Sequence, residues 1–206
     1  MSRARRLILV LVLNLALVAG LVVTGLAAHS LAVMAAGADY LADAGAIGVS
    51  LLAIWLTRCP PSLARPSGYP NATKWAALLN AGWLLVLNVI IAGTAVARLA
   101  AGARQVQGLP VLVASGIAAL VMLAGALALA GDADGGDDGD DLNVKAVLLD
   151  TAADAAAAAG VAVSGAVILA AGGWYWLDPA VALVIALVVG YHAQKLVREV
   201  TAALRP

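Results

Sequence analysis

Six long apolar runs, separated by short polar stretches, follow one another along the chain. They lie at residues 7–28, 31–56, 75–97, 109–130, 144–171 and 179–197. Each run is close to the roughly 20 residues with which an α-helix crosses a hydrocarbon core about 30 Å thick. The first run is too long for the apolar core of a secretory signal, and further spans follow it. The pattern predicts an all-α membrane protein of six transmembrane helices.

The composition agrees with this pattern and narrows the chemistry. Hydrophobic residues make up 64% of the chain, charged residues 12%, and the mean hydropathy is +0.99. These values exclude a soluble globular domain. Cys59 is the single cysteine, and His29 and His192 are the two histidines, so neither an intramolecular disulfide nor a Cys/His zinc site can be assembled. We expect residues 1–206 to form one transmembrane domain.

Basic residues assign both termini to the cytoplasm, because Lys and Arg favour that side of a membrane. In this orientation ten of the twelve Lys and Arg residues are cytoplasmic, and Arg98 and Arg104 are outside. The stretch 59–70, between the second and third spans, is rich in residues that break helices. It is predicted to be an ordered cytoplasmic turn.

Two pairs of aspartates interrupt the apolar runs with the same spacing. Asp39 and Asp43 lie in the second run, and Asp150 and Asp154 lie in the fifth. Residues four positions apart share one face of a helix, with about 5–6 Å between their Cβ atoms. Two such faces turned together would form one site of four carboxylates. An acid at membrane depth costs roughly 2.5–3.5 kcal/mol on insertion scales, so we expect these residues to bind a cation.

A structural role remains an alternative for these acids and is preferred for three other residues. Buried neutral carboxylic acids can join helices by hydrogen bonds, although Asn or Ser would do so without an ionisable group. Asp178 precedes a proline and is interpreted as the ordinary start of the sixth helix. His29 and His192, near the ends of their helices, are interpreted as packing or interfacial residues.

Residues 131–143 are predicted to form an Asp- and Gly-rich cytoplasmic loop. Its aspartates are Asp132, Asp134, Asp137, Asp138, Asp140 and Asp141. Such a composition is typical of a solvated linker, and the spacing does not match an EF-hand. The alternative is weak capture of divalent cations, since six carboxylates raise the local cation concentration near the cytoplasmic mouth.

Aromatic and small residues indicate how the helices lie in the membrane and pack. An aromatic belt near the span ends is expected from Trp75, Trp83, Trp174, Tyr175 and Trp176, whereas Trp55 is equally consistent with packing. The small residues from Ala155 to Gly160 are expected to let the fifth helix pack closely on the second. Contact between two copies of the chain is favoured by small and polar residues of the third span, namely Ala76, Ala77, Asn80, Ala81, Gly82 and Asn88.

Several short motifs together resemble the cation diffusion facilitator (cation efflux) family, whose members export divalent transition metals in exchange for protons. They are Asn14, His29–Ala35 ahead of Asp39 and Asp43, Trp75–Asn80, Leu142–Lys145 ahead of Asp150 and Asp154, and Trp174–Pro179. Each motif alone is weak, but the set runs through most of the chain.

The resemblance implies that Asp39, Asp43, Asp150 and Asp154 form the metal transport site. Asp150 stands where zinc transporters of the family commonly have histidine, and Ala36 stands where many members have aspartate. The loop that is often histidine-rich in zinc exporters is aspartate-rich here. The resemblance also implies a short member without the family's C-terminal soluble domain, so that a homodimer would form through the transmembrane helices.

We therefore expect a divalent metal/proton antiporter in a prokaryotic-type inner membrane, and not an enzyme. Zn²⁺ is the favoured cargo, with Cd²⁺, Mn²⁺ or Fe²⁺ as alternatives, and neither a cofactor nor a nucleic acid is expected. Clustered carboxylates stay ionised around a divalent ion and take up protons when it leaves, which couples the two fluxes. Two other functions remain open: a non-transporting membrane protein with a structural cation site, and a proton-coupled exporter of small organic cations.

Overall fold

The computed structural model describes residues 3–57, 71–133 and 138–204. Side chains are described within residues 15–56, 71–127 and 151–202, except at positions 47, 50, 51, 54 and 73. The predicted turn at 59–70 therefore lies outside the described residues.

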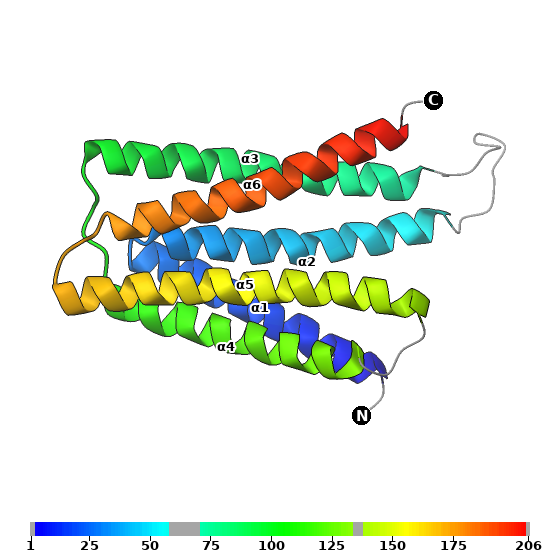
Figure 1. Ribbon diagram of the computed structural model, residues 1–206, viewed down its shortest axis with the longest axis horizontal. Coiled ribbons are helices and arrows are strands. Elements are labelled where there is room, and N and C mark those ends of the chain that lie inside the picture. Colours follow the sequence, from blue (N-terminus) through cyan, green and yellow to red (C-terminus); the bar gives the residue numbers. More distant parts are fainter. Residues whose placement is uncertain (1–2, 58–70, 134–137, 205–206) are drawn as a thin grey trace.

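Six helices make up the fold, as the apolar runs predict (Figure 1). They are α1 (Arg3–Ala27), α2 (Leu31–Thr57), α3 (Ala72–Ala101), α4 (Gly108–Ala133), α5 (Asp138–Ala171) and α6 (Leu177–Leu204). The described residues contain no strand. Both termini lie at one end of the bundle, which we call the terminal end, and the turns α1–α2, α3–α4 and α5–α6 lie at the other, the distal end (Figure 1).

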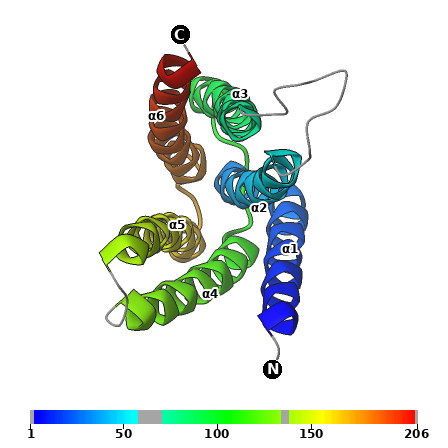
Figure 2. The same cartoon turned by 90° about the vertical axis from the view of Figure 1, so that its right-hand side faces the viewer.

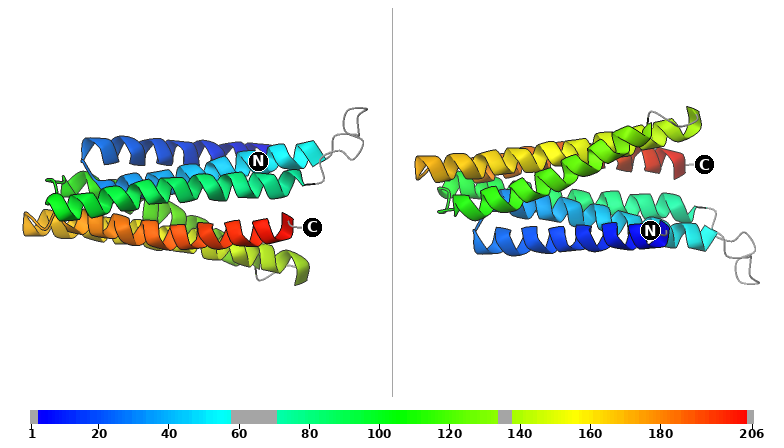
Figure 3. Two further views of the ribbon diagram at one scale, coloured as in Figure 1. Left: turned by 90° about the horizontal axis from the view of Figure 1, so that it is seen from above. Right: turned by 90° about the horizontal axis from the view of Figure 1, so that it is seen from below.

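The helices form two layers, α1–α3 and α4–α6, with α2 near the centre (Figures 2 and 3). The most extensive helix pairs are α4 with α5 and α3 with α6, and α2 packs on α1, α3 and α6. Within the described residues, α3, α4, α5 and α6 each contain a stretch long and apolar enough to cross a membrane. Helix α1 contributes a shorter apolar stretch, Leu15–Ala27. The chain is an all-α integral membrane protein.

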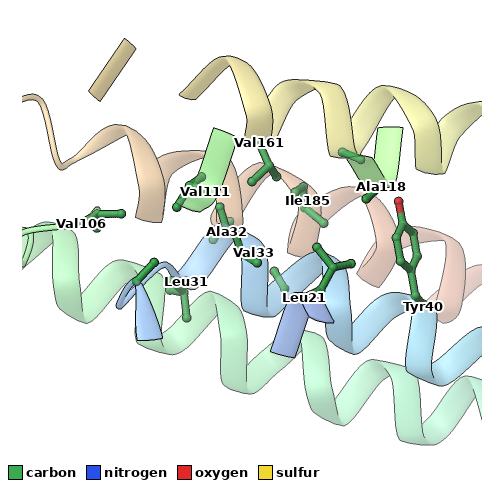
Figure 4. Close-up of a cluster of buried hydrophobic side chains, with 14 of the residues drawn as sticks. Leu21, Leu31, Ala32, Val33, Tyr40, Val106, Val111, Ala118, Val161 and Ile185 are labelled. Carbon is green, nitrogen blue, oxygen red and sulfur yellow. The ribbon is translucent and has the colours of Figure 1, made fainter. Parts of the chain in front are cut away.

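A core of small and branched side chains holds the two layers together (Figure 4). Leu21, Val33, Val111 and Val161 are almost completely buried, and alanines fill much of the remaining interior. The large apolar side chains of α3, including Trp75, Leu79 and Trp83, instead face outward. This inverted distribution is expected in a bilayer, where lipid is as apolar as leucine and helices associate through close packing of small residues.

Aromatic side chains lie only partly where the belt prediction puts them. Trp174 and Trp176 are exposed at the distal turn between α5 and α6, and Trp75 is exposed in the first turn of α3. Trp83 is also exposed, but it lies well inside α3 rather than near an end. The distal turn and the start of α3 therefore have the aromatic character of a membrane interface.

Helix α5 packs mainly on α4, with Gly165 at a close contact, and this corrects the prediction that residues Ala155 to Gly160 would let α5 pack closely on α2. A Cβ atom added to Gly165 would lie 2.7 Å from the backbone nitrogen of Leu112, and one added to Gly108 would lie 2.6 Å from the carbonyl oxygen of Gly165. Gly160, in contrast, has nothing within 4 Å of such a position, and α5 contacts α2 at few points. A small-residue pattern shows that a helix can be approached closely, but it does not say by which neighbour.

Part of the predicted Asp- and Gly-rich loop is helical. Helix α4 continues to Ala133 and α5 begins at Asp138, so the loop boundaries 131–143 are too wide at both ends. Acidic residues are favoured in the first turn of a helix because they complement its dipole, an effect that composition alone does not capture. The side chains of all six aspartates lie outside the described residues.

At the distal end, Asp178 of α6 accepts hydrogen bonds from the start of α2. The Ser30 hydroxyl donates to Asp178 Oδ1, and the backbone N–H groups of Leu31 and Ala32 donate to its oxygens at 2.6 and 3.3 Å. Ser30 Oγ in turn accepts from the N–H of Val33 at 3.1 Å. We call Asp178, Ser30, Leu31 and Ala32 the distal clamp. The interpretation of Asp178 as an ordinary start of its own helix was incomplete, because its carboxyl group caps a different helix.

Candidate metal-transport site

Helix α2 carries Asp39 and Asp43 from the distal clamp into the bundle. Because the clamp fixes the first turn at Leu31, the two aspartates lie about 12 and 18 Å further along the helix at 1.5 Å per residue. Both side chains are half-buried. Their spacing places them on one face, as predicted.

Asp154 approaches this region from α5, where α2 and α5 make a direct polar contact. The hydroxyl of Tyr40, which is 2% exposed, donates a hydrogen bond to the backbone carbonyl oxygen of Asp154 at 3.2 Å. Tyr40 extends from α2 toward α5 (Figure 4). The contact fixes the height at which α5 presents Asp154 beside the aspartates of α2.

A cavity of about 620 Å³ brings these acids together. Four helices line it: α2, α3, α5 and α6. Its apolar lining consists of Leu84, Ala153, Ala156, Ala157, Val184, Ile185, Val188 and Val189. Its polar lining consists of Asp39, Asp43, Asp154 and His192. The prediction that one face of α2 and one face of α5 are turned toward a shared space is consistent with this arrangement.

His192 is the lining residue that sequence reasoning missed. It was interpreted as structural because no second ligand is near it in the sequence. The signal that connects it to the acids is a stripe on α6, in which Val184, Val188 and His192 follow one another at intervals of four and all line the cavity. This stripe can be read only when the cavity is known, because α6 is apolar on several faces.

The remaining predicted residues have different outcomes. Asp150 belongs to α5, one helical turn from Asp154 on the same face, but its side chain lies outside the described residues, as does that of Asn14. Ala36 is buried in the packing of α2. His29 occupies the turn between α1 and α2 with a φ of 57°, and its carbonyl oxygen accepts a hydrogen bond from Arg98 at 2.9 Å, which supports a structural role.

The acids surround an open space and do not form a closed coordination shell. Within the part of the chain whose side chains are described, no three His, Cys, Asp or Glu side chains lie close enough together to hold one metal ion. Three carboxyl groups on a mainly apolar wall still favour a cation, because charges interact more strongly away from bulk water. The arrangement can therefore attract a cation, and a shift of α2 against α5 would change how tightly it is held.

Six helices around a cavity lined by three aspartates define a polytopic membrane protein. Residues 7–204 match the family model described as the cation efflux transmembrane domain. The chain belongs to this family.

Several relatives have names that specify their cargo. The chain is 30% identical over 180 residues to the zinc transporter ZitB of Escherichia coli (strain K12), covering 86% of this chain and 55% of that protein. It is 28% identical over 213 residues to the proton-coupled zinc antiporter SLC30A2 of Mus musculus, covering 98% and 57%. It is 26% identical over 175 residues to the cadmium, cobalt and zinc/H(+)-K(+) antiporter of Bacillus velezensis, covering 83% and 54%. The chain thus spans little more than half the length of these relatives.

Proposed function

We propose that this protein exports divalent transition-metal ions from the cytoplasm in exchange for protons, with Zn²⁺ as the favoured cargo. The observation that carries the proposal is the cavity in which Asp39, Asp43 and Asp154 from two helices meet. Membership of the cation efflux family and the names of the zinc and proton-coupled relatives support it. Cd²⁺ and Co²⁺ are further candidates, because the relative from Bacillus velezensis is named for them, and Mn²⁺ and Fe²⁺ also suit oxygen ligands.

The exchange follows from the chemistry of clustered carboxyl groups. With a divalent ion among them, Asp39, Asp43, Asp154 and the neighbouring Asp150 stay ionised because the ion offsets their mutual repulsion. When the ion leaves, like charges in a poorly solvated space favour proton uptake. The metal ion and protons therefore bind the same carboxyl groups in turn. Release of the metal ion prepares these groups to bind protons, and loss of the protons prepares them to bind metal.

Transport also requires the site to tighten and to open toward alternate sides. No three of the described ligand side chains are close enough to hold an ion, so we propose that a shift of α5 relative to α2 completes the site. Two features leave room for that movement: α2 and α5 contact each other at few points, and the cavity between them is lined mainly by small and aliphatic side chains. Rocking of helix groups around a site near the membrane midplane is the general pattern of secondary transporters.

The proposed setting is a prokaryotic-type plasma membrane with both termini cytoplasmic, so that the terminal end faces the metal source. We also propose a homodimer in which α3 contributes contacts through the exposed apolar residues Trp75, Leu79 and Trp83. Of the small and polar residues expected at this contact, Ala76, Ala81 and Asn88 are instead buried within the chain. Cross-linking and native mass measurement in lipid test the dimer, and detection of monomer alone would reject it.

Flux measurement tests the proposed function directly. Purified protein in liposomes loaded with a metal-responsive dye should move Zn²⁺ only when a pH gradient of the correct sign is present. Intact Zn²⁺ binding without flux would indicate a structural cation site instead. Proton-coupled movement of a small organic cation without metal flux would indicate an exporter of organic cations instead. Liposomes without protein and liposomes with Asp43→Ala protein are the controls.

A further inference from the structure

We propose that His192 supplies a nitrogen ligand to the cargo at the terminal end of the cavity, and that this ligand favours Zn²⁺ and Cd²⁺ over Mn²⁺. The inference rests on the proposed function and adds to it a residue on a third helix. It starts from the lining of the cavity, where His192 is the polar side chain that α6 contributes.

The distal clamp allows the depth of His192 to be compared with that of the aspartates. Asp178 of α6 bonds to Leu31 of α2, so residues counted from these two positions start at the same level. His192 lies fourteen residues beyond Asp178, or about 21 Å, and Asp43 lies twelve beyond Leu31, or about 18 Å, for helices running side by side. The imidazole therefore lies at about the depth of Asp43, near the end of the cavity from which a cytoplasmic ion would enter.

A hydrogen bond selects the ring nitrogen that is left for a ligand. His192 Nδ1 lies 2.9 Å from the carbonyl oxygen of Val188. Since a carbonyl oxygen can only accept, Nδ1 carries the hydrogen, and in the neutral ring Nε2 keeps its lone pair. Metal-binding histidines are commonly oriented in this way by a backbone carbonyl on their other nitrogen. The Tyr191 ring, with its centroid 5.7 Å away at 78°, further limits the orientation of the imidazole.

A single imidazole suits transient binding of an entering metal ion better than stable binding. His192 does not lie with two other described ligands in a cluster that could hold an ion, so an ion bound there would keep most of its water. It could then exchange those waters for the carboxylates of Asp43 and Asp154 further along the same cavity. Nitrogen ligands suit Zn²⁺ and related ions better than Mn²⁺, which prefers oxygen. His192 on α6 would thus supply a nitrogen ligand, which Asp150 of α5 cannot supply because its side chain offers only oxygen.

The test compares His192→Ala with the unmodified chain in liposomes, with Zn²⁺, Cd²⁺ and Mn²⁺ measured separately. We expect the KM for Zn²⁺ to rise roughly tenfold and that for Mn²⁺ by less than about threefold, with maximal rates within about twofold. His192→Gln places an amide near the position of Nε2 and should recover part of the Zn²⁺ effect. Leu187→Ala, a change at an exposed residue of α6 that does not line the cavity, is the matched control and should leave all three KM values unchanged.

Two results would overturn the inference. Unchanged KM values in His192→Ala would show that the imidazole does not meet the cargo. Equal increases for Zn²⁺ and Mn²⁺ would show that the residue only shapes the cavity. If the unmodified chain moves no metal, the proposed function fails, and Zn²⁺ competition with a fluorescent chelator on the purified protein then decides the role of His192 alone. Weaker Zn²⁺ binding by His192→Ala than by Leu187→Ala supports it, and equal binding rejects it.

Discussion

Asp178 and the cavity aspartates are the same residue type in two different environments. At the distal end, Asp178 is completely buried and accepts hydrogen bonds from three donors of the α2 terminus. Midway along the bundle, Asp39, Asp43 and Asp154 are half-buried on the wall of a cavity. A carboxyl group surrounded by fixed donors stabilises one arrangement of helices. Carboxyl groups on a cavity wall lie where an ion that enters the cavity can reach them.

The comparison shows that an acid in an apolar helix is not in itself evidence of transport. What distinguishes the two cases is position: Asp178 is buried between the starts of two helices, whereas the other three aspartates line a cavity that an ion can enter. The four predictions below test this distinction, from the largest expected effect to the smallest.

Removing a cavity carboxylate should abolish transport and leave the fold intact. For Asp43→Ala or Asp154→Ala we expect Zn²⁺ flux to fall at least roughly hundredfold, since a ligand is lost. Thermal stability should not fall, because like-charge repulsion is also relieved. Liposome flux and melting temperature measure the two effects. Glu199→Ala, at an exposed residue paired weakly with Lys195 at 3.9 Å, is the control. Flux retained in either aspartate variant would remove that residue from the site.

Removing the clamp carboxyl group should have the opposite signature. In Asp178→Ala, the Ser30 hydroxyl and the N–H groups of Leu31 and Ala32 lose their partner, and an unsatisfied buried group costs about 1–3 kcal/mol. We expect a total loss of about 3–5 kcal/mol of stability, measured by thermal unfolding in detergent. Flux per folded molecule should stay within about threefold of the unmodified protein.

A conservative change at the same position sharpens this result. Asp178→Asn keeps one acceptor oxygen and should lose roughly half as much stability. If Asp178→Ala stayed fully folded but carried no metal, Asp178 would belong with the cavity acids and the comparison would fail.

Changing Asp150 should alter selectivity more than rate. Oxygen ligands suit Mn²⁺, whereas a site with both nitrogen and oxygen ligands suits Zn²⁺ better. Asp150→His should therefore improve the preference for Zn²⁺ over Mn²⁺ by roughly threefold to tenfold. An unperturbed imidazole titrates near pH 6.5, so the pH dependence of flux should also move toward neutrality. Competition among Zn²⁺, Cd²⁺, Mn²⁺ and Fe²⁺ measures the ranking. An unchanged ranking would mean that helix geometry, and not ligand type at this position, sets selectivity.

Neutralising the acidic stretch that covers the end of α4 and the start of α5 should have the smallest effect. Replacing Asp132, Asp134, Asp137, Asp138, Asp140 and Asp141 with Asn preserves the length of the chain. If the stretch concentrates cations near the cytoplasmic mouth, the KM for Zn²⁺ should rise about twofold to threefold at low ionic strength, with the maximal rate unchanged. The same measurement in high salt is the control, since screening should remove the difference. An unchanged KM at low salt would leave the stretch as a connection between helices.

Local patterns along the chain were sufficient to predict the six helices and the helix face that carries Asp39 and Asp43. Apolar runs of membrane length gave six helices, because a segment in lipid must satisfy its backbone hydrogen bonds internally. The spacing of Asp39 and Asp43 predicted that they share one face of a helix, because the position of a side chain around a helix depends only on its spacing from near neighbours. The Asp- and Gly-rich loop was drawn too wide because composition does not describe how far a helix extends once it has started.

Only the tertiary structure decided which helices meet. It placed Gly165 of α5 against α4, turned Asp178 of α6 onto the start of α2, and added His192 to the cavity of the aspartates. The sequence determined that each of these residues lies on a helix and at what depth. It could not determine their partners, because a residue such as Ser30 and its acceptor Asp178 are 148 positions apart, and several apolar faces of each helix fit a neighbour equally well until all six are packed.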